Sequence, residues 1–159
     1  MKLVNLVQED FTNYKKPSIF IGFPECSGKC NKIAGKIVCQ NDQLKNAEKI
    51  EVSIQEIIDL YLDNPITKAI VCGGLEPFDT PEELLDLIES FRYFTNDDIV
   101  IYTGYTENEV KNMLIYGHLL QYPNIIIKYG RFIPDQKPHY DEILGVKLAS
   151  NNQYARNIT

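Results

Sequence analysis

Three cysteines follow a short apolar run near the N-terminus, and their thiolates are potential metal ligands. Three residues separate Cys26 from Cys30, and eight separate Cys30 from Cys39. Three thiolates can hold three irons of a [4Fe-4S] cluster and leave the fourth iron open for another ligand, whereas a fully protein-ligated cluster normally takes four cysteines. Gly28 and Gly35 would let such a loop curl around a cluster. An open iron favours chemistry over electron storage.

The spacing alone leaves a structural zinc site or plain core cysteines as alternatives. Zinc in structural sites normally takes four protein ligands in paired short spacings. Cys72 is the only other cysteine, and it lies in an apolar run, where a buried free thiol is the expected role. His118 and His139 are the only histidines. Neither has a partner at metal-ligand spacing, so we expect surface or structural roles for both.

A glycine pair, a glutamate and the end of a later apolar run supply further candidate binding residues. Gly73 and Gly74 would let the backbone approach a ligand closely, and Glu76 could accept hydrogen bonds from a ligand ammonium. The same three residues would also suit a simple turn between a strand and a helix. Tyr102 and Thr103 are candidates for lining the same pocket, although aromatic residues beside a glycine turn more often only pack.

Apolar runs alternate with segments of helical periodicity along most of the chain. The runs predict strands at residues 17–24, 68–72, 98–102 and 124–129. Helix starts are predicted by a capping box at Ser53 and Glu56, by Thr80 before Pro81, and by a second capping box at Thr106 and Glu109. This alternation indicates βαβ units and a largely parallel sheet. The sequence of residues 130–159 predicts no particular helix or strand.

The candidate residues fall at the carboxyl ends of the predicted strands. In open α/β sheets and barrels, ligands gather at these ends. Cys26, the pair Gly73-Gly74 and the pair Tyr102-Thr103 follow three different strands, so we expect them to share one site.

Composition indicates one folded domain, residues 1–159. The chain is long enough for one core and too short for two, and 44% hydrophobic with 24% charged residues is the balance of a folded soluble protein. A net charge of -6 without a Lys/Arg stripe argues against nucleic acid as a partner. The sequence has no N-terminal signal pattern and no apolar stretch of membrane-span length. We therefore expect a cytoplasmic protein whose cysteines are metal ligands or core residues rather than disulfides.

With these motifs in place, the chain resembles the radical S-adenosylmethionine (SAM) superfamily, and within it the activating proteins of anaerobic (class III) ribonucleoside-triphosphate reductases. The resemblance covers nearly the whole chain and rests on six segments: Cys26-x3-Cys30, Val38-Cys39-Gln40-Asn41, Gly73-Gly74-Leu75-Glu76-Pro77, Ile101-Tyr102-Thr103-Gly104-Tyr105, Gly130-Arg131-Phe132 and Ser150-Asn151-Asn152-Gln153. Two departures stand out. Eight residues rather than two separate Cys30 from Cys39, and Leu75 separates the glycine pair from the acid. A longer loop costs little closure entropy.

The resemblance implies a partial (βα) barrel of the radical SAM type with a mostly parallel sheet. It also implies that Cys26, Cys30 and Cys39 hold a [4Fe-4S] cluster and that the segment Gly73–Glu76 engages SAM. The reduced cluster would cleave SAM to methionine and a 5'-deoxyadenosyl radical, which would take a hydrogen atom from a glycine of the reductase. The protein itself would supply binding and orientation, while the cofactor carries the hard chemistry.

The implied partners are the large glycyl-radical subunit of the reductase and an electron donor of the flavodoxin or ferredoxin type. Two alternatives stay open. One is a radical SAM enzyme that acts on a small molecule, similar to 7-deazapurine synthases. The other is a zinc- or cluster-binding module without SAM chemistry.

Overall fold

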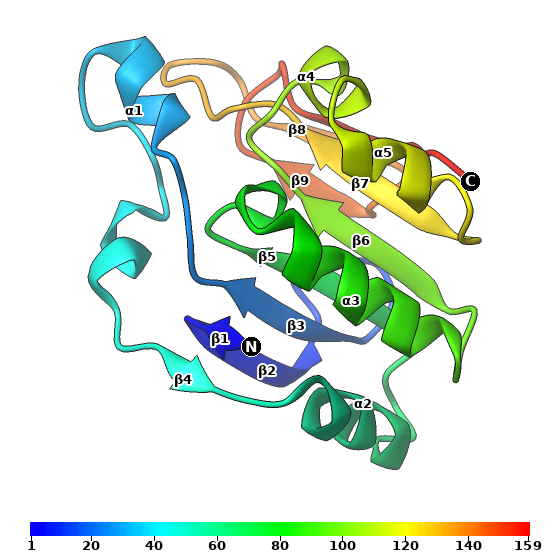
Figure 1. The fold of residues 1–159 in the computed structure, drawn as a ribbon. Coiled ribbons are helices and arrows are strands. Elements are labelled where there is room, and N and C mark those ends of the chain that lie inside the picture. The colour runs from blue at the N-terminus through cyan, green and yellow to red at the C-terminus, as the bar shows by residue number, and fades with distance from the viewer.

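The computed structural model describes residues 1–159, which form an α/β fold around a six-stranded mixed sheet (Figure 1). The strand order is β10-β7-β6-β5-β3-β2. The four central strands are parallel to one another, and the edge strands β2 and β10 run antiparallel to them. The bounds are β2 Asn5–Asp10, β3 Ser18–Phe23, β5 Ala69–Gly74, β6 Asp98–Tyr102, β7 Ile125–Tyr129 and β10 Tyr154–Asn157. The four strands predicted from the sequence are these central strands.

Four helices cover one face of the sheet (Figure 1): α2 Ile54–Asp63, α3 Pro81–Arg92, α4 Glu107–Lys111 and α5 Leu114–Leu119. Both predicted capping boxes, Ser53 with Glu56 and Thr106 with Glu109, are formed. Thr80 occupies the N-cap position of α3, but its side chain makes no capping hydrogen bond. The helix predicted after Thr106 is in fact two short helices, because the chain becomes extended at Met113.

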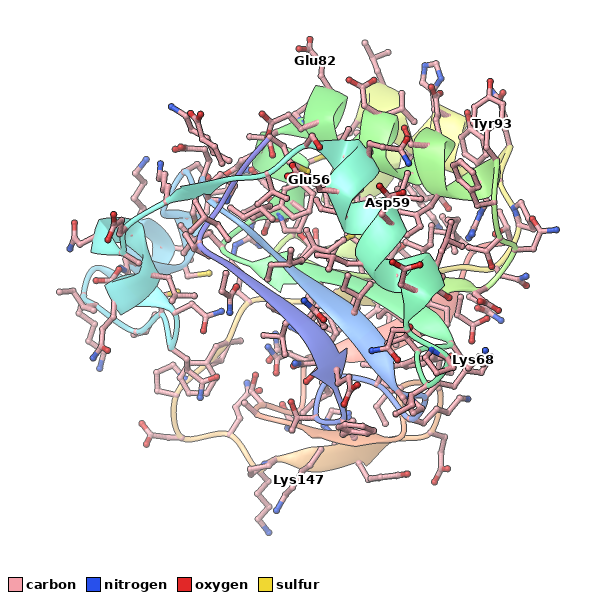
Figure 2. All side chains as sticks on the ribbon, turned by 90° about the horizontal axis from the view of Figure 1, so that it is seen from below. Glu56, Asp59, Lys68, Glu82, Tyr93 and Lys147 are labelled. Atoms are coloured by element: carbon pink, nitrogen blue, oxygen red, sulfur yellow. The ribbon has the colours of Figure 1, made fainter.

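The opposite face of the sheet is covered by a hairpin that the sequence did not predict. Strands β8 (His139–Asp141) and β9 (Val146–Leu148) pair antiparallel, and Figure 2 shows them, with Lys147, on the side away from the helices. The buried Asp141 carboxylate accepts hydrogen bonds from the backbone N–H groups of Ile143, Leu144 and Ala155. These bonds close the hairpin turn and tie it to β10.

The sheet therefore separates two apolar layers. Alternate residues of a strand point to opposite faces. Ile70 and Cys72 belong to the larger core beneath the helices, whereas Ala69 and Val71 belong to the smaller core beneath the hairpin. Fully buried side chains fill the larger layer, so the fold leaves room for a ligand at the carboxyl ends of the strands and beside the hairpin.

The cysteines lie in a long connection between β3 and β5. This connection contains helix α1 (Lys29–Ala34), the 3-10 helix η1 (Asp42–Asn46) and the short strand β4 (Ile50–Glu51), which pairs with β1 (Lys2–Leu3). In Figure 1, α1 projects beyond the carboxyl edge of the sheet. A second 3-10 turn, η2 (Pro77–Asp79), links β5 to α3. None of the helices is both long and apolar enough to cross a membrane.

Candidate functional site

A pocket of about 570 Å³ opens at the carboxyl ends of the central strands and extends along the hairpin side of the sheet, where residues of β2 and β9 line it. Its volume is within the range of small-molecule and cofactor sites, about 300–1,000 Å³. All the residues predicted from the sequence to bind a cluster or ligand line it: Cys26, Cys30, Cys39, Gly73, Gly74, Glu76, Tyr102 and Thr103. The histidines do not, since His118 is exposed on α5 and His139 lies in β8.

The three loop cysteines are close enough to influence one another. Each is partly exposed. Burial raises the pKa of the Cys30 thiol, and negative charge on Cys39 and Cys26 raises it further. Cys72 differs, because it is completely buried in the helix-side core, where desolvation raises its pKa to about 12. Three thiols face the pocket and the fourth is a core residue, as the sequence predicted for Cys72.

The eight residues between Cys30 and Cys39, the insertion, fold away from the site, since none of them lines the pocket, and the chain returns to the pocket at Cys39. Asn31 closes its base: the side-chain oxygen accepts hydrogen bonds from the backbone N–H groups of Val38 (2.9 Å) and Cys39 (3.0 Å). The amide nitrogen of Asn31 donates to Asp42 at 2.8 Å. The clasp holds Cys39 near Cys30 even though the spacing between them is long.

The cysteine loop runs beside the glycine-containing segment and is bonded to it. Asn41, which follows Cys39 closely in the sequence, donates its side-chain amide to the Gly74 carbonyl at 2.7 Å. The backbone N–H of Glu76 donates to the Glu25 carbonyl at 2.8 Å. Leu75 is therefore accommodated by continued pairing with the chain after β3, and Glu76 still reaches the pocket.

Close packing between neighbouring strands explains why glycine occupies positions 73 and 74. Gly74 has φ of +84°, and a Cβ atom there would lie 2.8 Å from the Cα atom of Gly22 on the neighbouring strand. A Cβ atom on Gly73 would lie 2.9 Å from the Phe20 ring. The two positions require glycine because β3 and β5 approach closely at the mouth of the site. Gly104 differs, because a Cβ atom there would make only ordinary contacts, 3.4 Å from the Cys30 sulfur and 3.6 Å from a Glu76 oxygen.

Glu76 is a buried carboxylate at the centre of the site. Its oxygens accept hydrogen bonds from the Thr103 hydroxyl (2.8 Å), the Gly104 N–H (2.8 Å) and the Phe78 N–H (3.3 Å). Burial raises its pKa to about 7, and the three donors oppose that rise. Thr103 is thus a residue that positions Glu76. Tyr102 donates its hydroxyl to the Asn13 carbonyl at 2.5 Å, which fixes its ring in the pocket wall.

Comparison with known families gives a match over most of this arrangement. A family model described as a 4Fe-4S single cluster domain matches residues 18–154, from the start of β3 to the start of β10. The chain belongs to this family. Neither the curated proteins nor the solved structures contained a match.

The residues present fit the cluster of a 4Fe-4S single cluster domain. The structure has no group of three or more cysteine, histidine or carboxylate side chains arranged around a single metal ion. A cluster makes a different demand, because each thiolate binds its own iron. Three partly exposed thiols border an open pocket, and backbone without a side chain at Gly104 leaves space beside Cys30.

The single cluster domain also contains a buried cation that sequence reasoning missed. Lys128, on β7, is only 7% exposed and lines the pocket. Its ammonium donates to the Gly130 carbonyl at 3.1 Å. Burial lowers its pKa to about 8, and the negative charges of Glu76 and Cys30 partly restore it. A lysine at the end of a run of three isoleucines was the available signal, because lysine is rarely buried without a role.

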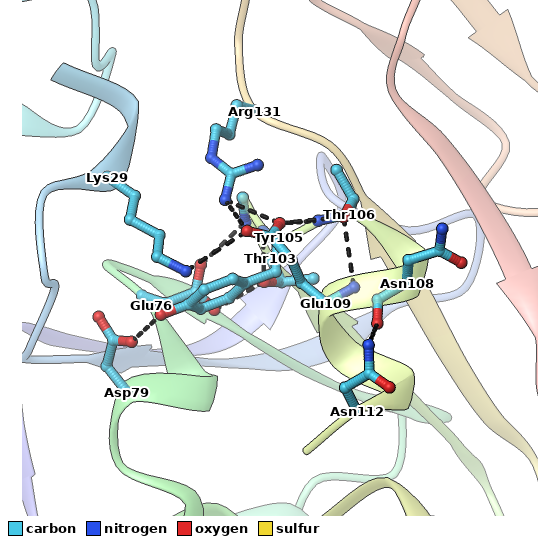
Figure 3. Close-up of polar contacts among 11 residues, drawn as sticks. Lys29, Glu76, Asp79, Thr103, Tyr105, Thr106, Asn108, Glu109, Asn112 and Arg131 are labelled. Carbon is cyan, nitrogen blue, oxygen red and sulfur yellow. Dashed lines mark hydrogen bonds and ion pairs between the residues drawn. The ribbon is translucent and has the colours of Figure 1, made fainter. Parts of the chain in front are cut away.

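A polar network fixes the first part of the cysteine loop to the sheet (Figure 3). The Tyr105 hydroxyl and the Ser27 backbone N–H both donate to Asp79, each at 2.5 Å. The Lys29 ammonium lies 4.4 Å from the centre of the Tyr105 ring.

Lys29 and Arg131 both pair with Glu109 at the start of α4. Arg131 lies 2.7 Å and 2.8 Å from the two Glu109 oxygens, and Lys29 lies 3.3 Å from one of them. The hydrogen bond from Arg131 is the main cause that lowers the pKa of Glu109 to about 2, and hydrogen bonds from Thr106 lower it further. The network connects the cysteine loop to β6, η2 and α4, so the cysteines are held by several elements of the domain.

Proposed function

We propose that this single cluster domain is a radical SAM activating enzyme. Its cluster would be held by Cys26, Cys30 and Cys39, SAM would bind in the adjoining pocket, and the product would be a glycyl radical on an anaerobic ribonucleotide reductase. When bound and reduced, the cluster supplies the electron that cleaves SAM to methionine and the 5'-deoxyadenosyl radical.

The observation that carries the proposal is the presence of a buried carboxylate and a buried ammonium in the pocket that the three thiols line. The amino-acid part of SAM has an ammonium and a carboxylate. Glu76 and Lys128, both lining the same pocket, offer a carboxylate and an ammonium in return. Charge-assisted hydrogen bonds of this kind are stronger than hydrogen bonds between neutral groups. They are stronger still in a buried site, where the local dielectric constant is low. A pocket built only to hold a cluster would have no need of two buried charged side chains.

In this proposal the protein's residues bind and orient. Thr103 and the Gly104 N–H hold the Glu76 carboxylate in place toward a ligand ammonium. Lys128 would meet the ligand carboxylate. The Asn31 and Asn41 side chains keep Cys39 and the Gly74 carbonyl at the pocket. The sheet would act as the partial barrel of radical SAM enzymes, a proposal supported by four adjacent parallel strands whose carboxyl ends surround the site.

The distribution of the core favours a protein substrate over a small molecule. The hairpin β8–β9 packs Leu144 and Leu148 against the sheet face that the helices leave free. The open volume runs on from the carboxyl ends of the strands along the hairpin side of the sheet, where Val7 of β2 and Leu148 of β9 line it. A flexible glycine-containing loop of another protein could enter there, and the substrate would bring its own binding surface. The large glycyl-radical subunit is the partner that this proposal requires.

The test begins with anaerobic reconstitution with iron and sulfide, followed by dithionite reduction in the presence of SAM. We expect a [4Fe-4S] electron paramagnetic resonance (EPR) signal that SAM perturbs, together with release of 5'-deoxyadenosine. A glycyl-radical doublet should then appear only when the large reductase subunit is added. A cluster indifferent to SAM would refute the radical SAM assignment. Turnover of a small substrate without a protein partner would refute the activating role alone.

A further inference from the structure

We propose that the insertion 31–38 is a docking surface for an acidic electron-donor protein with a low-potential flavin or iron–sulfur centre. The proposal rests on the proposed function, in which the cluster must be reduced before each reaction. One electron would pass from the donor's reduced centre to the cluster. The donor is oxidised by one electron, the cluster is reduced by one, and no covalent bond forms or breaks in this step.

The insertion has a defined shape. Helix α1 ends at Ala34, and Gly35, with φ of +65°, turns the chain back. Asn31 then bonds to the backbone of Val38 and Cys39, so the loop is closed at its base. A closed loop presents the same side chains to a partner each time, which lowers the entropy cost of binding.

The charge of this segment is opposite to that of the whole chain. From Ser27 to Asn41 the sequence has three lysines and no acidic residue, in a chain of net charge -6. Lys29 is engaged by Glu109 at 3.3 Å. Lys32 and Lys36 take part in none of the ion pairs in the structure. Two unpaired lysines on a projecting loop would attract a negatively charged surface and orient it toward the cysteines.

Two isoleucines lie next to these lysines and are exposed. Ile33 is 69% exposed and Ile37 is 75% exposed. Each directly follows one of the unpaired lysines in the sequence. Apolar side chains flanked by charges are typical of a protein interface, where the apolar groups are buried and the charges form a rim. The small size of the patch suits transient redox complexes, which bury less than about 1,200 Å².

The position of the insertion favours the electron donor as the protein that binds it. Cys30 and Cys39 line the pocket, but no residue between them does. A protein seated on residues 31–38 would therefore lie beside the cluster ligands and leave the pocket open. Helix α1 has six residues, or roughly 9 Å of helix, so the exposed side chains stay close to Cys30. The reductase glycine must enter the pocket, whereas an electron donor needs only proximity to the cluster.

The experiment compares two charge reversals. The test variant is Lys32→Glu with Lys36→Glu. The control is Lys15→Glu with Lys68→Glu, which changes the net charge equally; both control lysines are exposed and free of ion pairs. Figure 2 shows Lys68 at the opposite end of the sheet from the cysteine loop. Cluster reduction is followed by anaerobic stopped-flow absorbance with a purified flavodoxin or ferredoxin, and separately with dithionite.

We expect the test variant to be reduced by the protein donors at least about tenfold more slowly at low ionic strength. Added salt should narrow the difference, because it screens the attraction. Dithionite should reduce the test variant at the wild-type rate. The protein donors should reduce the control variant at the wild-type rate. A second variant, Ile33→Ser with Ile37→Ser, should slow donor reduction at all salt concentrations.

Three outcomes would overturn the proposal. The first is equal donor-driven reduction of the wild type and both test variants. The second is no reduction of the wild type by either donor. The third is normal donor reduction of the test variants with a loss of glycyl-radical formation under dithionite, which would assign the surface to the reductase. Failure of the radical SAM assignment is recognised separately, because 5'-deoxyadenosine would then be absent even with dithionite.

Discussion

The interior of the sheet and its carboxyl edge belong to the same strands but are held together in different ways. In β5, Ile70 and Cys72 are completely buried among apolar side chains. Beyond the strand end, Glu76 is also buried, yet three directed hydrogen bonds hold it. Burial of apolar area stabilises the interior. The edge keeps charged groups out of water, which costs stability and prepares them for a ligand. Substitutions in the two regions should therefore separate stability from function.

The two kinds of cysteine provide the sharpest contrast. Cys39→Ala should abolish the intact [4Fe-4S] cluster and with it essentially all SAM cleavage, because one iron loses its thiolate. Cys72→Ala should keep both and lose about 1 kcal/mol of stability from the core. Iron and sulfide content, EPR spectra and 5'-deoxyadenosine yield measure the difference. A full, active cluster in the Cys39 variant would mean that the third ligand has been misassigned.

A core substitution should show the reverse pattern. Leu87 on α3 is completely buried in the helix-side core. Leu87→Ala should lower the free energy of unfolding by about 2–5 kcal/mol, because it removes apolar contacts and leaves a cavity. The folded fraction should still take up a normal cluster. Urea denaturation of the apo-protein and iron content of the refolded protein test this. Loss of the cluster without a decrease in the free energy of unfolding would show that substitutions in the core cannot be separated from effects on the cluster site.

Glu76→Gln should affect function far more than stability. Removing a charged hydrogen-bond acceptor should weaken SAM binding about 10- to 100-fold. Stability at pH 8 should change little. The neutral side chain avoids the cost of burying a charge, because the pKa of Glu76 is raised to about 7, and this gain offsets the loss of one acceptor for the donors that now bond to Glu76. Isothermal titration with the non-cleavable S-adenosylhomocysteine and denaturant unfolding give the two readouts. Unchanged affinity would remove Glu76 from the binding site.

The buried charges also predict a pH window for binding. Glu76 is ionised above about pH 7 and Lys128 is protonated below about pH 8. A ligand that needs both charges should bind best between these values, with affinity about tenfold lower at about pH 6 and about pH 9. Lys128→Met should bind more weakly and show a smaller decline on the alkaline side, where deprotonation of the ligand's own ammonium remains. A flat profile for S-adenosylhomocysteine would contradict the pairing of these groups with its amino-acid part.

The smallest effect is expected at the network around Glu109. The pair with Arg131 is partly exposed, and such pairs are worth about 1 kcal/mol or less. Glu109→Gln should therefore cost little at neutral pH. The pKa of Glu109 is lowered to about 2, so its contribution is present above about pH 4.5 and lost as the pH falls toward 2. Wild type and variant should converge in acid unfolding of the apo-protein. A decrease of several kcal/mol in the free energy of unfolding would show that the network around Glu109 contributes more to stability than a partly exposed ion pair does.

Local patterns predicted the centre of the fold and the membership of the site. Apolar runs predicted the four parallel strands, and capping boxes predicted the starts of two helices. The positions of the cysteines and Glu76 after the predicted strands indicated that they would line one pocket. Residues 139–157 form three strands of three or four residues, which are too short to show a periodicity. The bonds of Glu109 to Arg131 and of Asn41 to Gly74 join distant parts of the chain. Their geometry exists only after folding.

The clasp at Asn31 has a consequence for how such a protein can change over time. Because Asn31 bonds to the backbone of Val38 and Cys39, the residues between them form a loop with a closed base, and changes in their number or type need not alter that base. Surface loops of this kind tolerate length changes well. Under the proposed function, new associations could then arise in one short stretch of sequence while the cluster site is inherited intact. The proposed recognition surface and the proposed reaction site would be adjacent in space and yet able to evolve separately.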